Sequence, residues 1–481
     1  MNKNLKKTKI IATLGPATSS KETMIQMIQA GVDVFRINFS HADYELVKRN
    51  VEIIREINKE YGYSVSILGD LQGPKLRVGV VKEGSFLNPG DVLTFTNEKM
   101  EGDATKVYMT YEKFPQDVKV GERILIDDGK LVLEVIETNN LDTVRAKTIQ
   151  GGPLSSKKGV NLPNTNVSLP ALTEKDIEDA NFMLDLELDW IALSFVRHAQ
   201  DIIDLKELMA KHPTNKTKTP IIAKIEKPEG VKNIDEILME CDCLMVARGD
   251  LGVEVPMEQV PVIQKNLVNK ARLYAKPVII ATQMMETMIN SLTPTRAEVN
   301  DVANSVLDGA DAVMLSGETS VGKYPVDVVR NMAKIVKNIE KTAIYRKINQ
   351  VKEEKINCVD ERFISDKVCR SAVDIARSTG AEAIVTLTAS GYTAFQISAH
   401  RPSSHIIVFS SNKRVITMLN LLWGVRAFYY DMQKSTDETV IQVNMLTHNY
   451  GFVEQGDFVV NLNAMPVHNG GKTNTLRLST I

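Results

Sequence analysis

Short apolar runs recur along the first 345 residues, and helical patterns separate most of them. Eight runs have the length of buried strands, namely residues 9–15, 34–38, 65–71, 190–196, 220–225, 243–248, 277–282 and 310–316. Seven of these runs lead directly into a helical pattern. Because strands that alternate with helices pair in parallel, this part of the chain predicts an α/β fold, a (β/α)8 barrel.

The stretch after the third predicted strand lacks helical periodicity. Between Pro74 and about Pro170 short alternating β runs replace it, with turn signals at residues 88–90 and 151–153. Residues on either side of the Asp128-Gly129 turn predict a hairpin. We therefore expect a β-barrel-like domain over residues 74–169, inserted in a barrel loop and able to act as a lid.

A charged run at residues 352–355 is typical of a linker. Beyond it, a helical pattern at 365–379 precedes alternating strands and helices, with strands expected at 383–387, 405–409, 425–430 and 458–462. This arrangement predicts a smaller C-terminal α/β domain over residues 355–481. The barrel would then consist of residues 1–73 and 170–345.

Polar side chains gather at the carboxyl ends of the predicted barrel strands, where the active site of such a barrel lies. Lys224 and Glu226 are two residues apart on a strand, so both side chains face the barrel interior. Glu226 and Asp250 offer two hard oxygen ligands, which suit Mg²⁺ or Mn²⁺. The alternative, a buried lysine paired with two carboxylates for structural reasons alone, is energetically costly.

Composition excludes several other classes of protein. The 481 residues carry 58 basic and 60 acidic side chains, so no overall field favours nucleic acid or an anionic membrane. No apolar run approaches the roughly 18 residues of a membrane span, and the apolar stretch after the basic N-terminus is too short for a signal peptide. Four cysteines make no disulfide framework, and Cys241 and Cys243 are typical of a core rather than a zinc site. We expect a cytoplasmic protein.

Six segments at the strand ends carry a resemblance to a known family. They are residues 36–41 (RINFSH), 69–75 (GDLQGPK), 222–228 (IAKIEKP), 247–252 (ARGDLG), 281–286 (ATQMME) and 314–319 (MLSGET). In this order, with an insertion after the third strand, they closely resemble pyruvate kinase. The resemblance implies phosphoryl transfer from phosphoenolpyruvate to ADP, the last step of glycolysis, through an enolate that is then protonated, in a homotetramer.

The resemblance also implies roles for individual residues. Moving a phosphoryl group mainly requires that charge be neutralised and aligned. Lys224 would stabilise the enolate, and Glu226 with Asp250 would hold the metal. The substrate would be bound by Arg36, Lys224, Gly249, Asp250 and Thr282, the enolate protonated with the help of Thr282 and Ser316, and the nucleotide bound near Asn38, His41 and Arg77.

A monovalent cation site is implied at Asn38, Ser40, Asp70 and Leu71. Many pyruvate kinases that need K⁺ have Thr, Lys and Glu where this chain has Leu71, Gln72 and Lys75, and members with Leu, Gln and Lys there generally do not need it. We therefore expect the Lys75 ammonium to replace K⁺. The alternative is that Lys75 is an ordinary exposed lysine on a loop.

The C-terminal domain of the family holds an effector site. Thr386, Thr388, Ser390, Gly391 and Thr393 resemble its phosphate loop, which would take a sugar phosphate or a nucleotide. Phe395 stands where many members have a basic residue, and His400 where an aromatic residue is common. A plain loop remains the alternative, and the identity of an effector does not follow from these residues.

Two other classes of protein share parts of this pattern. An aldolase-type lyase could use Lys224, Glu226 and Asp250 with Mg²⁺, but it would not explain the inserted domain or the third domain. A catalytically silent regulatory relative would usually lose a metal ligand or the lysine, and this chain keeps all three.

Overall fold

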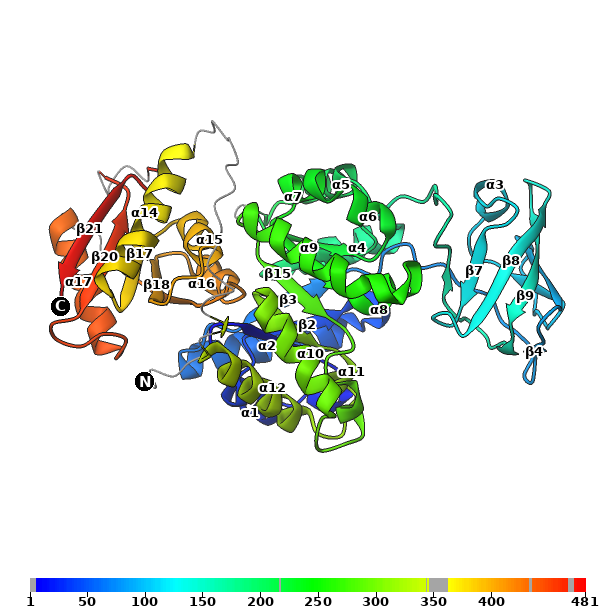
Figure 1. The fold of residues 1–481 in the computed structure, drawn as a ribbon, viewed down its shortest axis with the longest axis horizontal. Helices are drawn as coiled ribbons and strands as arrows, with labels where there is room; N and C mark the ends of the chain where they lie inside the picture. The colour runs from blue at the N-terminus through cyan, green and yellow to red at the C-terminus, as the bar shows by residue number, and fades with distance from the viewer. Residues whose placement is uncertain (1–5, 216–217, 343, 346–361, 432–434, 466–470) are drawn as a thin grey trace.

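The computed structural model describes residues 6–215, 218–342, 344–345, 362–431, 435–465 and 471–481, without the side chains of residues 41 and 436. The charged run predicted as a linker lies outside these ranges. The molecule has three parts in a row, with the C-terminal α/β part at one end, the barrel in the centre and the inserted β part at the other end (Figure 1).

The central part is a closed barrel of eight parallel strands, as the apolar runs predict. Its order is β1-β16-β15-β14-β13-β12-β3-β2. The strands are β1 Lys9–Thr13, β2 Val34–Asn38, β3 Ser66–Asp70, β12 Trp190–Leu193, β13 Ile221–Ile225, β14 Cys243–Ala247, β15 Val278–Ala281 and β16 Ala312–Leu315. Most end one to three residues before the predicted boundary, because the polar residues there belong to the loops that build the site.

Helices surround the barrel, and local signals set their ends. The main ones are α1 Lys21–Ala30, α2 Tyr44–Tyr61, α4 Glu174–Asp185, α5 Ala199–Ala210, α7 Ile234–Glu240, α9 Val260–Leu273, α10 Arg296–Asp308 and α12 Pro325–Glu340. In α10, Thr295 and Glu298 form a capping box, and Gly309 ends the helix with a φ of 101°. Among the described helices, none has the length and apolar character needed to cross a membrane.

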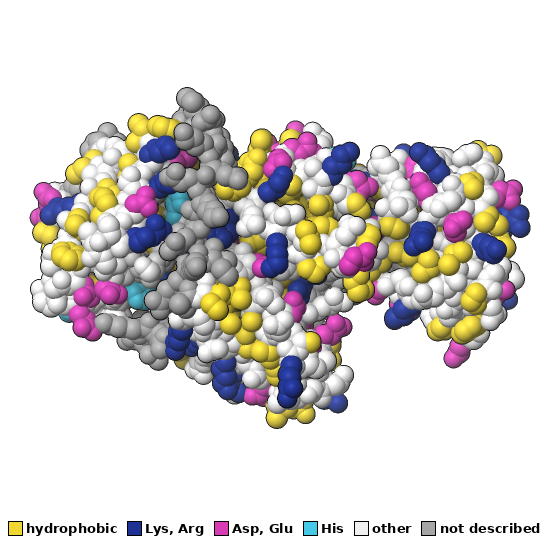
Figure 2. Space-filling model, in the orientation of Figure 1, with side chains coloured by type: hydrophobic (Ala, Val, Ile, Leu, Met, Phe, Trp, Pro, Cys, Tyr) yellow, Lys and Arg dark blue, Asp and Glu magenta, His cyan; other side chains and the backbone are white. Residues whose placement is uncertain are grey.

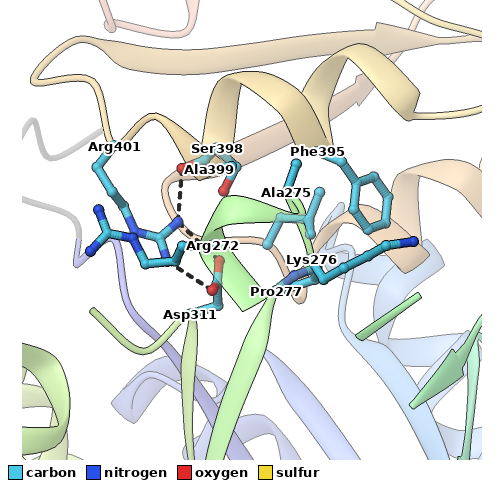
Figure 3. A pocket seen from close by; sticks show the side chains of 10 residues that line it. Arg272, Ala275, Lys276, Pro277, Asp311, Phe395, Ser398, Ala399 and Arg401 are labelled. Atoms are coloured by element: carbon cyan, nitrogen blue, oxygen red, sulfur yellow. Dashed lines mark hydrogen bonds and ion pairs between the residues drawn. The ribbon is translucent and has the colours of Figure 1, made fainter. Parts of the chain in front are cut away.

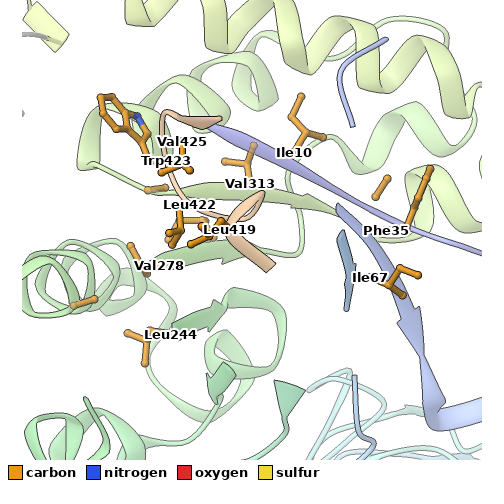
Figure 4. Packing of buried hydrophobic residues seen from close by; sticks show 14 of the residues in the cluster. Ile10, Phe35, Ile67, Leu244, Val278, Val313, Leu419, Leu422, Trp423 and Val425 are labelled. Atoms are coloured by element: carbon orange, nitrogen blue, oxygen red, sulfur yellow. The ribbon is translucent and has the colours of Figure 1, made fainter. Parts of the chain in front are cut away.

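The C-terminal part closes the amino end of the barrel. Leu421 is fully buried in the barrel's interior cluster, and the indole of Trp190 donates a hydrogen bond to the Met418 carbonyl at 3.0 Å. Leu422 and Trp423 lie close to the strands that carry Val278 and Val313 (Figure 4). Because the C-terminal part covers this end of the barrel, we expect the active site at the carboxyl ends of the strands.

A buried ion pair joins the same two parts. Arg401, which follows α15 (Tyr392–Ala399), binds Asp311 at the start of β16, with 2.7 Å between Nη2 and Oδ2 (Figure 3). The side chains are 1% and 3% exposed, and the Arg401 guanidinium also lies 4.9 Å from the centre of the Trp423 ring. Asp311 accepts the Val278 amide as well, so the junction is tied to two barrel strands.

The inserted part has a sheet and a core of its own. Its six-stranded sheet, a half-barrel, has the order β11-β7-β8-β9-β5-β6, beside a two-stranded β10-β4 ribbon. The strands are β4 Phe86–Leu87, β5 Val92–Thr96, β6 Lys106–Tyr108, β7 Arg123–Ile126, β8 Leu131–Thr138, β9 Thr143–Gln150, β10 Gly152–Pro153 and β11 Val160–Asn161, with a short helix, α3 Phe114–Asp117. Ile126 pairs with Leu131 across the turn, which confirms the predicted hairpin.

The C-terminal part is a five-stranded sheet with helices, in the order β19-β18-β17-β20-β21. Its elements are α14 Phe363–Thr379, β17 Ala383–Leu387, α15, β18 His405–Ser410, α16 Lys413–Leu419, β19 Val425–Tyr429, α17 Thr436–Asn449, β20 Phe458–Asn463 and β21 Thr475–Thr480. The sequence analysis did not predict β21, which pairs antiparallel with β20 at the edge of the sheet. Its short Leu476 and Leu478 alternation is a weak strand signal.

The visible surface carries charges of both signs. On the face in Figure 2, Lys and Arg side chains are interspersed with Asp and Glu, without a large area of one sign. This distribution agrees with the nearly balanced composition of the chain.

Candidate active site

Four charged residues converge at the carboxyl ends of the strands. Lys224 Nζ lies 3.2 Å from Asp70 Oδ1 and 3.0 Å from Glu226 Oε1. Asp70 also accepts Arg36 Nε at 2.7 Å. Arg36, Asp70 and Lys224 lie on β2, β3 and β13, and Glu226 directly follows β13, so closure of the barrel brings together side chains up to 190 residues apart.

Lys224 and Asp70 are buried, but their neighbours favour the charged form of each side chain. Burial disfavours the charged form of Lys224, but Asp70 and Glu226 outweigh it and raise the pKa of Lys224 above its ordinary value. Burial also opposes the charge on Asp70, while Lys224 and Arg36 lower the pKa of that carboxyl. Lys224 is therefore a fixed ammonium that can face an anionic substrate.

Glu226 differs from Asp70 because a second acid is nearby. Burial raises the pKa of Glu226 to about 7 against the opposing effect of Lys224, and the negative charge of Asp250 adds to the increase. Two carboxylates that repel each other in this way suit a divalent cation, which would offset both charges. In the described residues, no three His, Cys, Asp or Glu side chains are grouped as metal ligands, so other ligands would come from water and substrate.

Thr282 lies at a strained end of β15. Thr282 and Gln283 both have positive φ, 68° and 54°, which side chains other than glycine rarely adopt. The Arg248 guanidinium donates to the Thr282 carbonyl at 2.8 Å and also binds Asp301. The hydroxyl of Thr282 is thereby held in place, and it accepts the Gly249 amide at 2.7 Å. Arg248 thus supports the turn that presents Thr282.

Gly249 and Asp250 lie in α8 (Arg248–Glu254), directly after β14. A Cβ at Gly249 would stand 3.2 Å from the Thr282 hydroxyl, tighter than most side-chain contacts. Glycine therefore permits the close approach of these two strand ends. The structure brings Gly249 and Thr282 together, and Asp250 follows Gly249 in α8.

Ser316 is half-buried at the end of β16. The buried Glu318 carboxylate accepts the Ser316 amide at 2.7 Å and the Met285 amide at 3.1 Å. Glu318, one of the polar residues at the strand ends, therefore holds the ends of β15 and β16 together through their backbones.

The residues predicted to form the cation site lie on β2 and β3 or within two residues of their ends. Asn38 and Asp70 are register partners, and Asn38 Oδ1 accepts the Ser40 amide at 3.1 Å. The Leu71 side chain is buried, and its carbonyl accepts the Ser194 hydroxyl at 2.7 Å. Lys75 lines the cleft between the barrel and the inserted part, together with Asp250 and Glu254.

Arg77 and His41 are two of the residues predicted to bind the nucleotide. Arg77 lies in the inserted part, and its guanidinium donates to the Lys157 carbonyl at 3.0 Å. The side chain of His41 lies outside the described part of the structure.

The predicted effector loop runs from β17 into α15. Thr386 is fully buried, and the hydroxyl of Thr393 bonds to that of Thr473 at 2.7 Å inside the protein. Thr388 accepts the Gly391 amide at 2.9 Å, whereas Ser390 is exposed. Phe395 packs against Trp190 of the barrel, with ring centres 6.3 Å apart.

The sequence analysis missed two polar residues of the site. Ser194, just after β12, accepts a hydrogen bond from Lys224 Nζ at 2.6 Å. Thr13, at the end of β1, accepts Arg36 Nη1 at 3.1 Å and donates to the Leu315 carbonyl. Both follow the rule used for the other residues, since each is a hydroxyl at a strand end.

A barrel with buried charges and a carboxylate pair at its carboxyl strand ends has the organisation of a barrel enzyme that handles a charged substrate. Two family models match the chain: "Pyruvate kinase, barrel domain" over residues 5–329 and "Pyruvate kinase, alpha/beta domain" over residues 366–479. The chain belongs to the pyruvate kinase family.

Similar proteins agree with this assignment. A pyruvate kinase of Mycobacterium intracellulare is 42% identical over 474 residues, covering 98% of each chain. Pyruvate kinase 2 of Synechocystis is 44% identical over 460 residues, covering 95% of this chain and 76% of that protein. A crystal structure of a Cryptosporidium parvum pyruvate kinase has a TM-score of 0.91 and 34% identity, covering 99% of this chain and 96% of that one. The chain is a kinase of glycolysis that transfers the phosphoryl group of phosphoenolpyruvate to ADP and yields pyruvate and ATP.

Proposed function

We propose that Lys224 is the central catalytic residue of this reaction. The observation that carries the proposal is the convergence of Arg36, Asp70 and Glu226 on or around its ammonium. A fixed positive charge at that place stabilises the negative charge of the enolate as the phosphoryl group leaves. Arg36, which is paired with Asp70, offers a planar set of donors for phosphoryl oxygens.

Glu226 and Asp250 are the proposed ligands of Mg²⁺ or Mn²⁺. Held there, the cation would supply positive charge to substrate oxygens. Gly249, Asp250 and Thr282 border the place proposed for the substrate carboxylate. Thr282 and Ser316, on neighbouring strands, are proposed to guide the proton that reaches the enolate. Asn38, His41 and Arg77 are proposed to bind the nucleotide.

The proposed monovalent cation site is formed by Asn38, Ser40, Asp70 and Leu71, with K⁺ not required because Lys75 supplies a charge. The position of Lys75 in the cleft beside Asp250 and Glu254 means that its charge would act across the cleft. An assay in tetramethylammonium buffer at constant ionic strength tests this, since strong activation by added K⁺ would contradict it.

The remaining proposals concern organisation and regulation. The domains are proposed to be residues 1–73 with 170–345, 74–169 and 355–481, assembled as a cytoplasmic homotetramer without nucleic-acid or membrane partners. A sugar-phosphate or nucleotide effector at Thr386, Thr388, Ser390, Gly391 and Thr393 would find Ser390 exposed but Thr386 and Thr393 turned inward. The loop would therefore bind an effector through the Ser390 hydroxyl and backbone amides.

The test of the catalytic proposal is Lys224→Met, assayed by coupling pyruvate formation to an indicator enzyme with ADP and Mg²⁺. Losing one preorganised charge should lower kcat by about 10²- to 10³-fold or more. The exposed Lys334→Met on α12 is the matched control and should keep normal activity. A folded Lys224→Met enzyme with nearly normal kcat would refute the role proposed for Lys224.

A further inference from the structure

Lys224 has three oxygen partners within 3.2 Å, and only one of them is uncharged. The three are Asp70 and Glu226, which form ion pairs with the ammonium, and Ser194, which accepts a hydrogen bond from it. Asp70 is shared with Arg36, and Glu226 is a proposed metal ligand. Ser194 is the partner whose contact does not compete with another cation.

The Ser194 hydroxyl is itself fixed on its other side. It donates to the Leu71 carbonyl at 2.7 Å and accepts from Lys224 at 2.6 Å, so both roles of the hydroxyl are used. Ser194 is 2% exposed, and a Cβ at Gly73 would stand only 3.0 Å from the Ser194 Cβ. The chain therefore encloses this side chain and leaves it little freedom to turn.

The residues after Ser194 strengthen the connection with the site. Phe195 has a positive φ of 55°, and its amide donates to Glu226 Oε2 at 2.8 Å. The turn that directs the Ser194 hydroxyl to Lys224 thus also holds the neighbouring carboxylate. A strained backbone at this place indicates that the position of the turn matters.

We propose that Ser194 is a positioning residue for Lys224, holding the ammonium in line with the reacting phosphoenolpyruvate without neutralising its charge. This inference rests on the catalytic role proposed for Lys224. Orientation of a charge that acts in the transition state affects kcat more than substrate binding. If Ser194 only packed against its neighbours, replacing it would change the stability of the fold rather than kcat.

The test compares Ser194→Ala, which removes the hydroxyl, with Ser194→Cys, which keeps a group of similar shape but replaces the strong hydrogen-bonding oxygen by sulfur. Both variants should lower kcat by about 10- to 100-fold while KM for phosphoenolpyruvate stays within about threefold. The control is Ser66→Ala, a buried hydroxyl at the opposite end of β3, which should keep normal kcat. Normal kcat in Ser194→Cys would show a packing role and overturn the proposal.

A double variant, Ser194→Ala with Lys224→Met, tests whether Ser194 acts through Lys224. It should be no slower than Lys224→Met alone, because the residue to be positioned is already missing. An additional loss equal to that of Ser194→Ala alone would overturn the proposal. If Lys224→Met itself keeps normal kcat, the role of Lys224 fails, whereas a slow Lys224→Met beside a normal Ser194→Ala refutes only the role of Ser194.

Discussion

Two buried acids at this site have pKa values that are shifted in opposite directions. Asp70 and Glu226 are both buried acids beside the same lysine, yet the pKa of Asp70 is lowered and that of Glu226 is raised to about 7. The difference follows from their other neighbours, since Asp70 has Arg36 as a second cation and Glu226 faces Asp250. The acid with surplus negative charge nearby is the one suited to a divalent metal.

Replacing either proposed metal ligand by its amide should weaken metal activation. Glu226→Gln and Asp250→Asn keep the shape of the side chain but remove one negative charge. The Mg²⁺ concentration for half-maximal rate should rise about tenfold or more, measured by Mg²⁺ titration at saturating substrates and by calorimetric Mn²⁺ binding. Glu240→Gln, an acid paired with Lys206 on the barrel surface, is the control. Unchanged titrations in both variants would exclude these residues as ligands.

His400 should make the protein less stable in mild acid. Burial lowers the pKa of His400 to about 4, with Arg370 and Arg377 adding to the decrease and Asp374 opposing it. In the unfolded chain this histidine has a pKa of about 6.5, so it takes up a proton before the folded protein does as the pH falls. The contribution of neutral His400 to the free energy of unfolding is therefore complete above about pH 6.5 and is lost as the pH falls towards 4. At pH 5.5 this loss amounts to about 1 kcal/mol.

The measurement is the thermal midpoint at pH 7.5 and pH 5.5. His400→Gln should lose less on acidification than the unchanged protein, by about 1 °C for a chain of this length. His448→Gln, at an exposed position on α17, should behave like the unchanged protein. An equal loss in the His400→Gln protein would show that His400 does not cause the acid sensitivity.

At the scale of elements, the loop after β12 connects the site with the inserted part. Ser194 contacts Lys224 and Phe195 contacts Glu226, while Arg197 donates to the Val167 and Leu169 carbonyls at 2.6 Å each. Residues 167 and 169 lie on the segment by which the chain returns from the insertion to the barrel. One short loop thus contacts both the site and this return segment.

Arg197→Met should loosen this return segment. The substitution removes two hydrogen bonds from a charged donor, which together contribute on the order of 2 kcal/mol or more to local stability. Amide exchange of residues 165–170 should then be about 30-fold faster, measured by mass spectrometry. Arg330→Met, an exposed arginine on α12, should leave exchange there unchanged. Unchanged exchange in Arg197→Met would show that other contacts hold the segment.

At the scale of the whole molecule, the inserted part and the barrel border a cleft. Lys75, Asn161, Lys227, Asp250 and Glu254 are among the residues that line it. Glu254 Oε1 accepts hydrogen bonds from Asn161 Nδ2 of the inserted part at 2.7 Å and from Lys227 Nζ of the barrel at 2.6 Å. This bridge lies beside the proposed metal ligand Asp250, so movement of the insertion would alter the surroundings of the metal.

Closure of the insertion over the site should be visible in solution. Excluding water during transfer favours the reaction, so phosphoenolpyruvate and ADP with Mg²⁺ should together draw the inserted part towards the barrel. The Lys224→Met variant would bind both substrates while reacting slowly. Its radius of gyration by small-angle scattering should fall with both ligands and less with either alone. An unchanged radius would argue against closure.

Local patterns account for much of this protein. The eight barrel strands, the hairpin at residues 123–136 and the strands of the C-terminal part except β21 are predictable because apolar periodicity and turn residues act over a few neighbours. That Lys224, Glu226 and Asp250 lie near one another could be predicted, because parallel strands in a barrel place their carboxyl ends on one face.

Contacts between distant segments were decided only by the tertiary structure. That Lys224 takes Ser194 as its uncharged partner, that Phe395 packs on Trp190 and that Arg401 is neutralised by Asp311 depends on how strands close and parts dock. No local pattern records such pairings, because the partners are from 30 to 205 residues apart in the chain. Folding brings them together, and burial then makes each pairing strong enough to set a charge or a position.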